Sequence, residues 1–215
     1  EDLSRGLGDV YKRQHLERSE FPSLEINTDR ATGNCDVISY SSNHNDEFSK
    51  LPLERIELII QALSFRTKEL INNSKIKYIL PFENKGKEIG VTLEHPHGQI
   101  YSFGHIPEII KKQSIAQKIN PLNKYLFDIP EELILKKNNT AISFVPRWAR
   151  YPFEIWVVPY RKISHLFELS DEEQQGLAEL ILEASKKLDA IFNSPMPYTL
   201  CLLYTSPSPR DKSSS

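Results

Sequence analysis

The chain has 215 residues, of which 39% are hydrophobic and 26% are charged, so it is long enough to bury one sizeable core. Its formal net charge of −2 argues against a nucleic-acid-binding protein, which normally carries a basic excess. The hydrophobic runs fall short of the roughly 18 residues that a membrane span needs, and Cys35 and Cys201 fit no paired spacing. These features predict a cytoplasmic protein that binds neither nucleic acid nor membranes.

The two ends of the chain differ in composition from the residues between them. Residues 1–14 follow no helical or strand period, and residues 201–215 turn abruptly into a Ser- and Pro-rich stretch that cannot build a core. Residue 1 is not Met, and the only methionine is Met196. We therefore expect a truncated protein, with a non-native segment at 1–14 and a non-native, disordered tail at 201–215.

The first predicted elements are a strand, a long helix and two more strands. Val37–Tyr40 is rich in β-branched and aromatic residues, which is typical of a strand. Leu53–Asn73 repeats apolar residues at the i, i+3, i+4 spacing of an amphipathic helix. Ile76–Phe82 and Ile89–Leu93 are predicted strands, and the glycine-containing stretch Glu83–Lys87 is predicted to be a turn between them.

The second part of the chain shows a similar order of elements. Residues 105–130 are punctuated by prolines and predict a crossing loop with helical turns. Thr140–Val145 and Phe153–Pro159 are predicted strands, and a helix is predicted from Ser170, where Ser170 and Glu173 form a capping box. Strands joined by hairpins, with long helices on one face, indicate an α+β fold with a mainly antiparallel sheet. The recurring order suggests two pseudo-repeated halves.

The most informative stretch is His95-Pro96-His97-Gly98-Gln99. Side chains alternate faces along a strand, so we expect His95, His97 and Gln99 to point the same way. Pro96 lacks an N–H and Gly98 lacks a Cβ. We therefore expect this strand end to let a ligand approach the backbone closely.

These side chains suit the transfer of a nucleotidyl group. A neutral imidazole nitrogen of His97 can attack an α-phosphorus and form a phosphoramidate intermediate, and a free imidazole is mostly neutral at pH 7. The other ring nitrogen should then donate to a backbone carbonyl. Gln99 can donate to a phosphate oxygen as charge develops there. Taken alone, the His-Pro-His tripeptide could also be a surface loop or a metal site without catalysis.

Three more residues are candidates for the same site. Asn84 adds an amide donor beside the strand, or is simply a turn residue that tolerates a left-handed backbone. Thr92 either offers a hydroxyl to phosphate or is only a strand former. His44, in an Asn-His-Asn-Asp stretch, is a metal ligand, a neighbour of an Asx turn or an exposed residue. His105 and His165 have no partner at a useful spacing and are expected to lie in loops.

The stretch Phe82-Glu83-Asn84-Lys85-Gly86, followed by residues 90–100, resembles the galactose-1-phosphate uridylyltransferase family of the histidine-triad superfamily. Shorter matches extend the resemblance over residues 21–199. It implies a histidine-triad-like fold of two halves, the first at 15–130 with the His-Pro-His-Gly-Gln site and an incomplete second at 131–200. It also implies a homodimer.

The resemblance implies a ping-pong exchange in which UDP-glucose and galactose 1-phosphate give glucose 1-phosphate and UDP-galactose. His97 would be the uridylylated nucleophile, and Gln99 would hold the phosphoryl oxygens. Asn84 would contact the phosphates of the UDP-sugar, with Thr92 assisting. Another histidine-triad nucleotidyltransferase, a nucleotide-sugar phosphorylase, a hydrolase, or an inactive metal- or nucleotide-binding fragment remain alternatives.

A structural zinc ion is also implied by the resemblance. In the family, zinc is bound by histidines at the positions of His44 and His95, together with an upstream cysteine pair. That pair is absent from this sequence, so the zinc site is expected to be incomplete. The chain also leaves the family pattern after Thr199 and loses the segment that contacts the sugar.

Overall fold

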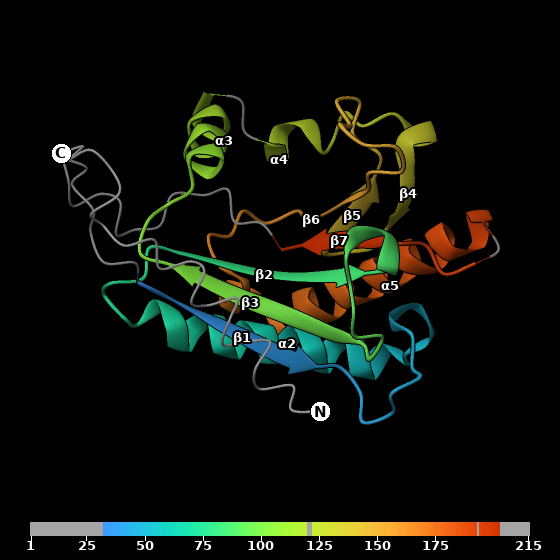
Figure 1. Ribbon diagram of the computed structural model, residues 1–215. Helices are drawn as coiled ribbons and strands as arrows, with labels where there is room; N and C mark the ends of the chain where they lie inside the picture. The colour runs from blue at the N-terminus through green and yellow to red at the C-terminus, as the bar shows by residue number, and fades with distance from the viewer. Residues whose placement is uncertain (1–31, 120–121, 193, 203–215) are drawn as a thin grey trace, which may run out of the picture. The chain divides into compact units, whose positions relative to one another are not determined.

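The computed structural model describes residues 32–119, 122–192 and 194–202, which all belong to one compact unit. Its main feature is a four-stranded antiparallel sheet in the order β1-β3-β2-β7 (Figure 1). The strands are β1 (Gly33–Ser39), β2 (Tyr78–Lys85), β3 (His97–Phe103) and β7 (Tyr198–Cys201). Strand β3, which carries His97 and Gln99, therefore lies inside the sheet, between β1 and β2.

Two long helices cover one face of this sheet. The helices α2 (Leu53–Ile71) and α5 (Asp171–Phe192) contact each other, as the ribbon shows (Figure 1). Their apolar stripes form one core together with Ile79 and Ile100 of the sheet. The predicted capping box is confirmed at the start of α5: Ser170 N–H donates to Glu173 Oε2 (2.8 Å), and Glu173 N–H donates to Ser170 Oγ (3.2 Å).

A smaller sheet packs beside α5. Its antiparallel order is β4-β5-β6, with β4 at Ile134–Lys137, β5 at Ala141–Phe144 and β6 at Trp156–Pro159. Phe144 and Ile142 are fully buried in a second hydrophobic cluster under this sheet. The α+β prediction with mainly antiparallel strands is confirmed, whereas the proposed internal repeat stays a prediction.

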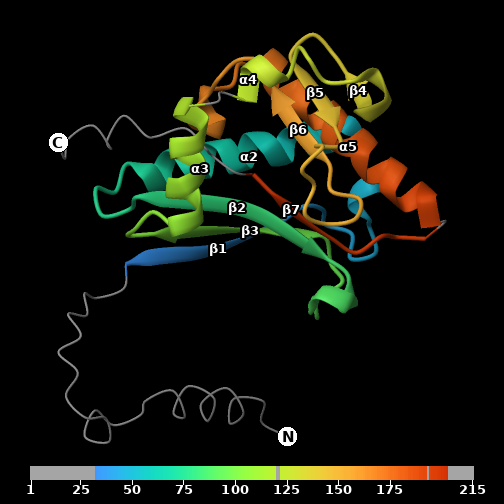
Figure 2. The ribbon, with the colours of Figure 1, turned by 90° about the horizontal axis from the view of Figure 1, so that it is seen from above.

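The remaining helices are short. Helix α3 (Glu108–Ile119) lies above β2 and β3 in Figure 1 and in front of them when seen from above in Figure 2, on the side away from α2. Helix α4 spans Leu122–Tyr125. Single 3-10 turns lie at Phe48–Lys50, Lys87–Ile89, Glu131–Leu133 and Leu166–Glu168. No helix in the described part of the chain is long and apolar enough to cross a membrane.

Two predictions between α2 and β3 are wrong. No strand forms at Ile89–Leu93, where a 3-10 turn and irregular backbone lie instead. The residues predicted as a turn at Glu83–Lys87 mostly continue β2, which runs to Lys85 because β7 pairs with Phe82–Lys85. A backbone segment whose N–H and C=O groups are hydrogen-bonded to a partner strand stays extended, even where its local sequence favours a turn.

The described residues test the expected segment boundaries only at the start of the predicted tail. The predicted segment at 1–14 lies outside the described residues, as does most of the predicted tail. Strand β7 includes Cys201, and Leu202 N–H donates to the Pro81 carbonyl (3.0 Å), so the first two residues of the predicted tail extend the sheet. The division of 15–200 at residue 130 stays a prediction, and β7 from the second segment joins the sheet of the first.

Candidate active site

The four-stranded sheet has a core face and an open face, and the candidate site residues lie on the open face. Ile100 and Gly98 are buried on the side of the helices, so the alternating residues His97 and Gln99 face the other way. Gln99 is paired in register with Phe82 of β2. Asn84 lies two residues farther along β2, on the same face as Phe82. Because β2 and β3 are antiparallel, this direction along β2 leads toward His97 on β3.

The ring of His97 is held in one tautomer. Nδ1 lies 2.8 Å from the His95 carbonyl oxygen, which can only accept, so Nδ1 carries the proton. The expected hydrogen bond to a backbone carbonyl is therefore present. It leaves the lone pair on Nε2, the nitrogen at the far side of the ring, and the side chain is only half-buried. In the neutral ring, Nε2 is thus the nitrogen that can act as a nucleophile.

His95 lies before β3 and turns its ring toward the end of β1. Its Nε2 lies 2.7 Å from Ser39 Oγ and 2.9 Å from the Ser41 carbonyl oxygen. The ring stacks on that of His44, with centroids 5.4 Å apart. The sequence predicts that His95, His97 and Gln99 point the same way. His97 and Gln99, which lie within β3, share one face, whereas His95 lies before the strand and contacts the end of β1.

The two stacked imidazoles do not complete a zinc site. Structural zinc ions take four nitrogen or sulfur ligands in a tetrahedron. Across the described ranges, no three His, Cys, Asp or Glu side chains gather at metal-binding distances. Cys35 lies elsewhere, paired in register with Tyr101. His44 and His95 can supply two zinc ligands, and their metal role stays a prediction.

Gly98 serves the core and not the ligand, so this part of the interpretation is wrong. A Cβ added to Gly98 would overlap with the hydroxyl oxygen of Tyr40 and lie 2.7 Å from Tyr40 Cζ. Tyr40 is 3% exposed, and its N–H donates to the Pro96 carbonyl (2.9 Å). The missing side chain thus lets β3 lie directly on the Tyr40 ring, which supports the backbone between His97 and Gln99.

Substituting Gly98 by alanine is expected to lower the free energy of unfolding by about 3 kcal/mol, because the added Cβ would overlap with the buried Tyr40 side chain. Tyr40→Phe should partly rescue Gly98→Ala, since it removes the oxygen with the worst overlap. Gly104→Ala is the matched control and should cost about 1 kcal/mol, as its nearest neighbour would be Thr32 Cβ at 3.2 Å. Urea denaturation of these three variants and the unchanged chain measures this, and equal losses at both glycines would contradict the packing argument.

Asn84 and Thr92 occupy different settings. Asn84 is half-buried, and its Oδ1 accepts a hydrogen bond from Thr199 Oγ1 (2.9 Å) across the β2–β7 pair. Thr92 is exposed in the irregular segment before β3. The structure therefore builds Asn84 into the same sheet face as His97 and Gln99, while Thr92 lies outside the strands.

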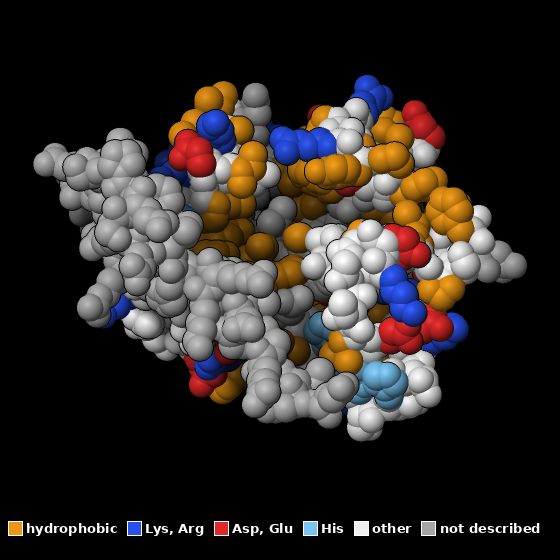
Figure 3. Space-filling view, viewed as in Figure 1, with side chains coloured by type: hydrophobic (Ala, Val, Ile, Leu, Met, Phe, Trp, Pro, Cys, Tyr) orange, Lys and Arg blue, Asp and Glu red, His pale blue; other side chains and the backbone are white. Residues whose placement is uncertain are grey.

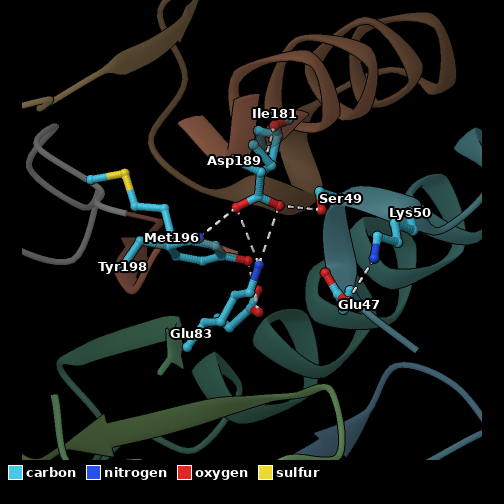
Figure 4. Close-up of polar contacts among 10 residues, drawn as sticks. Glu47, Ser49, Lys50, Glu83, Ile181, Asp189, Met196 and Tyr198 are labelled. Carbon is cyan, nitrogen blue, oxygen red and sulfur yellow. Dashed lines mark hydrogen bonds and ion pairs between the residues drawn. The ribbon is translucent and has the colours of Figure 1, made fainter. Parts of the chain in front are cut away.

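Beneath Asn84, the core face of β2 carries a cluster of polar groups (Figure 4). Glu83 is 4% exposed; its Oε1 accepts from Tyr198 Oη (2.9 Å), and its Oε2 has no partner. Burial raises the pKa of Glu83 to about 8, although the Tyr198 hydrogen bond and the charge of Lys85 oppose this. At neutral pH the carboxyl is therefore mostly protonated.

Asp189 of α5 ties this cluster to the surrounding elements. It accepts from Ser49 Oγ (2.5 Å) and Met196 N–H (2.7 Å) and pairs with Lys85 Nζ (3.4 Å). Burial raises the pKa of Asp189, but these hydrogen bonds and the Lys85 charge outweigh burial and lower it overall. An ionised Asp189 thus links α5, β2 and the residues just before β7. No spacing or motif in the sequence assigns a role to Glu83 or Asp189.

The open face also carries aromatic side chains. Rings of Phe82, Tyr101 and Phe103 follow one another with centroids 5.0 and 6.4 Å apart. In Figure 3, which keeps the view of Figure 1, hydrophobic side chains gather in a hollow above β2 and below α3 and α4. The polar groups of His97, Gln99 and Asn84 therefore share a sheet face with an apolar surface.

Comparison with known proteins identifies the family of this chain. The N-terminal domain of galactose-1-phosphate uridyl transferase matches residues 10–107, and its C-terminal domain matches residues 124–214. The chain belongs to the galactose-1-phosphate uridylyltransferase family. Both matches include some residues of the terminal segments that were expected to be non-native.

Two curated relatives of this family illustrate the similarity. A galactose-1-phosphate uridylyltransferase from Thermotoga maritima is 34% identical over 179 residues, which cover 80% of this chain and 56% of that protein. One from Streptomyces lividans is 31% identical over 192 residues, or 84% of this chain and 53% of that protein. The chain thus spans little more than half the length of these relatives.

Solved structures show the same fold. A uridylyltransferase mutant superimposes with a TM-score of 0.76 at 32% identity, covering 83% of this chain and 61% of that one. An ADP-glucose phosphorylase from Arabidopsis thaliana, solved with bound ADP-glucose, gives a TM-score of 0.73 at 25% identity, covering 81% of this chain and 57% of that one. A uridylyltransferase and a phosphorylase solved with ADP-glucose thus share the fold of this chain.

Proposed function

We propose that this chain carries the nucleotidyl-transfer site of a UDP-glucose–hexose-1-phosphate uridylyltransferase, with His97 as the nucleophile. The observation that carries the proposal is the hydrogen bond from His97 Nδ1–H to the His95 carbonyl, which leaves Nε2 as the nitrogen with the lone pair in the neutral ring, on the open sheet face. Membership of the uridylyltransferase family supports the choice of reaction.

In the first step, His97 Nε2 attacks the α-phosphorus of UDP-glucose. A P–N bond forms, the bond from the α-phosphorus to the bridging oxygen breaks, and glucose 1-phosphate leaves with the electron pair of that bond. The ring becomes a uridylyl-imidazolium whose Nδ1–H still donates to the His95 carbonyl. Because that acceptor is already in place, the positive charge that develops on the ring is stabilised without rearrangement.

In the second step, a phosphate oxygen of hexose 1-phosphate attacks the same phosphorus. The P–N bond breaks, its electron pair returns to Nε2, and a UDP-hexose is released. Splitting the exchange in this way replaces one difficult displacement by two easier ones at a single nucleophile.

Gln99 and Asn84 are proposed to bind the phosphates. Both carry an amide on the face of His97, and amide N–H groups can donate to phosphate oxygens without adding a formal charge. Thr92, exposed in the segment before β3, is proposed to assist. The proposed partners are UDP-glucose, UDP-galactose and hexose 1-phosphate, and a second copy of the chain in a homodimer.

The test is to incubate the chain with UDP-glucose and to measure its intact mass. We expect one added uridylyl group per chain and an equal amount of free glucose 1-phosphate. Added galactose 1-phosphate should remove the adduct and yield UDP-galactose. A chain that stays unlabelled at saturating UDP-glucose would contradict the proposal.

A second candidate is a nucleotide-sugar phosphorylase, which the structural similarity to an ADP-glucose phosphorylase favours. The same histidine adduct would then pass its nucleotidyl group to inorganic phosphate. Incubation of the labelled chain with phosphate alone separates the two: release of UDP supports the phosphorylase, and release of UMP without any acceptor indicates a hydrolase.

A further inference from the structure

Thr199 contacts the candidate site although it lies far from the site residues in the sequence. It sits on β7, opposite Asn84 in the register of the β2–β7 pair. Its Oγ1 donates to Asn84 Oδ1 over 2.9 Å, from a position 115 residues away along the chain. The Thr199 side chain is exposed on the open face, because Tyr198 and Leu200 turn toward the core.

The direction of this hydrogen bond decides what Asn84 offers to a ligand. A carboxamide has an acceptor oxygen on one side and two N–H donors on the other. With Oδ1 engaged by the Thr199 hydroxyl, the Nδ2 group is left to point along the open face. Phosphate oxygens only accept hydrogen bonds, so the opposite orientation would bring the amide oxygen against them and repel them.

The backbone that carries Thr199 is fixed by its neighbours. Tyr198 donates to the buried Glu83, and Met196 N–H donates to Asp189, so both residues tie this part of the chain to β2 and α5 (Figure 4). Side-chain hydrogen bonds thus join β7 to β2 on both faces of the sheet. Tyr198 bonds to Glu83 on the core face, and Thr199 bonds to Asn84 on the open face. This leaves little freedom for the Asn84 amide to turn over.

We propose that Thr199 is a positioning residue for uridylyl transfer, whose hydroxyl orients the Asn84 carboxamide so that its N–H donors face the phosphates of the nucleotide sugar. The inference rests on the proposed function and adds a residue to it. Thr199 itself touches no reacting atom, since its hydroxyl proton is used on Asn84 Oδ1.

The experiment compares Thr199→Val, which removes the hydroxyl and keeps the shape and the strand preference, with Thr199→Ser, which keeps the hydroxyl. At UDP-glucose concentrations below saturation, we expect Thr199→Val to slow the formation of the uridylyl adduct by about tenfold, the effect of one lost phosphate hydrogen bond. Thr199→Ser should stay within about twofold of the unchanged chain. Thermal unfolding of each variant shows that the fold is kept.

The same substitution in an Asn84→Ala background separates positioning from a general effect on the sheet. Because the amide that Thr199 orients is then gone, Thr199→Val should change the rate by less than about twofold. A residue that only stabilises β7 would instead cost the same in both backgrounds and would lower the melting temperature.

Equal rates for Thr199→Val and the unchanged chain would overturn the inference while leaving His97 labelling intact. So would a Thr199→Ser variant as slow as Thr199→Val, or an undiminished loss in the Asn84→Ala background. If the unchanged chain is not labelled by UDP-glucose at all, the proposed function fails, and the positioning role fails with it.

Discussion

Replacing His97 by asparagine is expected to abolish the uridylyl adduct and to slow hexose exchange by about 10⁴-fold or more. Asparagine can keep a hydrogen bond to the His95 carbonyl, which His97 Nδ1 now makes, but it has no basic nitrogen that could attack phosphorus. The change therefore removes the nucleophile and preserves most of the local contacts. Intact-mass measurement after incubation with UDP-glucose reads out the adduct directly.

His105→Asn is the matched control for this experiment. His105 is an exposed histidine just beyond the end of β3, with its ring against Phe103. We expect its variant to be labelled at the same rate as the unchanged chain. Labelling that survives in His97→Asn, or is lost equally in both variants, would show that the nucleophile lies elsewhere.

The sequence was sufficient to place His97 and Gln99 together because their relation is local. Alternation along a strand depends only on neighbouring residues, and it holds once the strand begins at His97. The capping box of α5 was found for the same reason, since its two residues lie three apart in the sequence. Features set by short-range geometry could therefore be predicted.

The predictions for 83–87 and Gly98 are wrong because these residues contact residues far away in the sequence. The stretch 83–87 has the composition of a turn, yet Glu83 to Lys85 stay extended because β7 arrives from residues 198–201. The sequence predicts space for a ligand at Gly98, whereas that space is taken by Tyr40, more than fifty residues earlier. No spacing rule within β2 or β3 could have indicated either contact, and the role of Thr199 was hidden for the same reason.

The buried Glu83 makes a second large effect measurable. Its pKa of about 8 in the folded chain lies above the value near 4.5 of an exposed glutamate, so the fold favours the protonated form. Below pH 4.5 the carboxyl is protonated in both the folded and the unfolded chain. As the pH rises, the unfolded chain loses this proton first, and the fold loses stability at about 1.4 kcal/mol per pH unit until the folded carboxyl ionises near pH 8.

Glu83→Gln is therefore expected to remove this dependence. Glutamine keeps an oxygen that can accept from Tyr198 and carries no charge at any pH. Between pH 5 and pH 8, the free energy of unfolding of the variant should gain roughly 4 kcal/mol relative to the unchanged chain. Urea denaturation at a series of pH values measures the difference.

Glu132→Gln makes the same chemical change at an exposed glutamate and should leave the pH dependence as it is. The other charged group facing Glu83 is Lys85, which pairs with Asp189, and both remain in the two variants. If Glu83→Gln and Glu132→Gln follow the same pH curve, the Glu83 carboxyl is ionised in the folded chain. Its negative charge would then lie beneath Asn84 and would oppose the binding of phosphate on the open face. A neutral Glu83 places no such charge there.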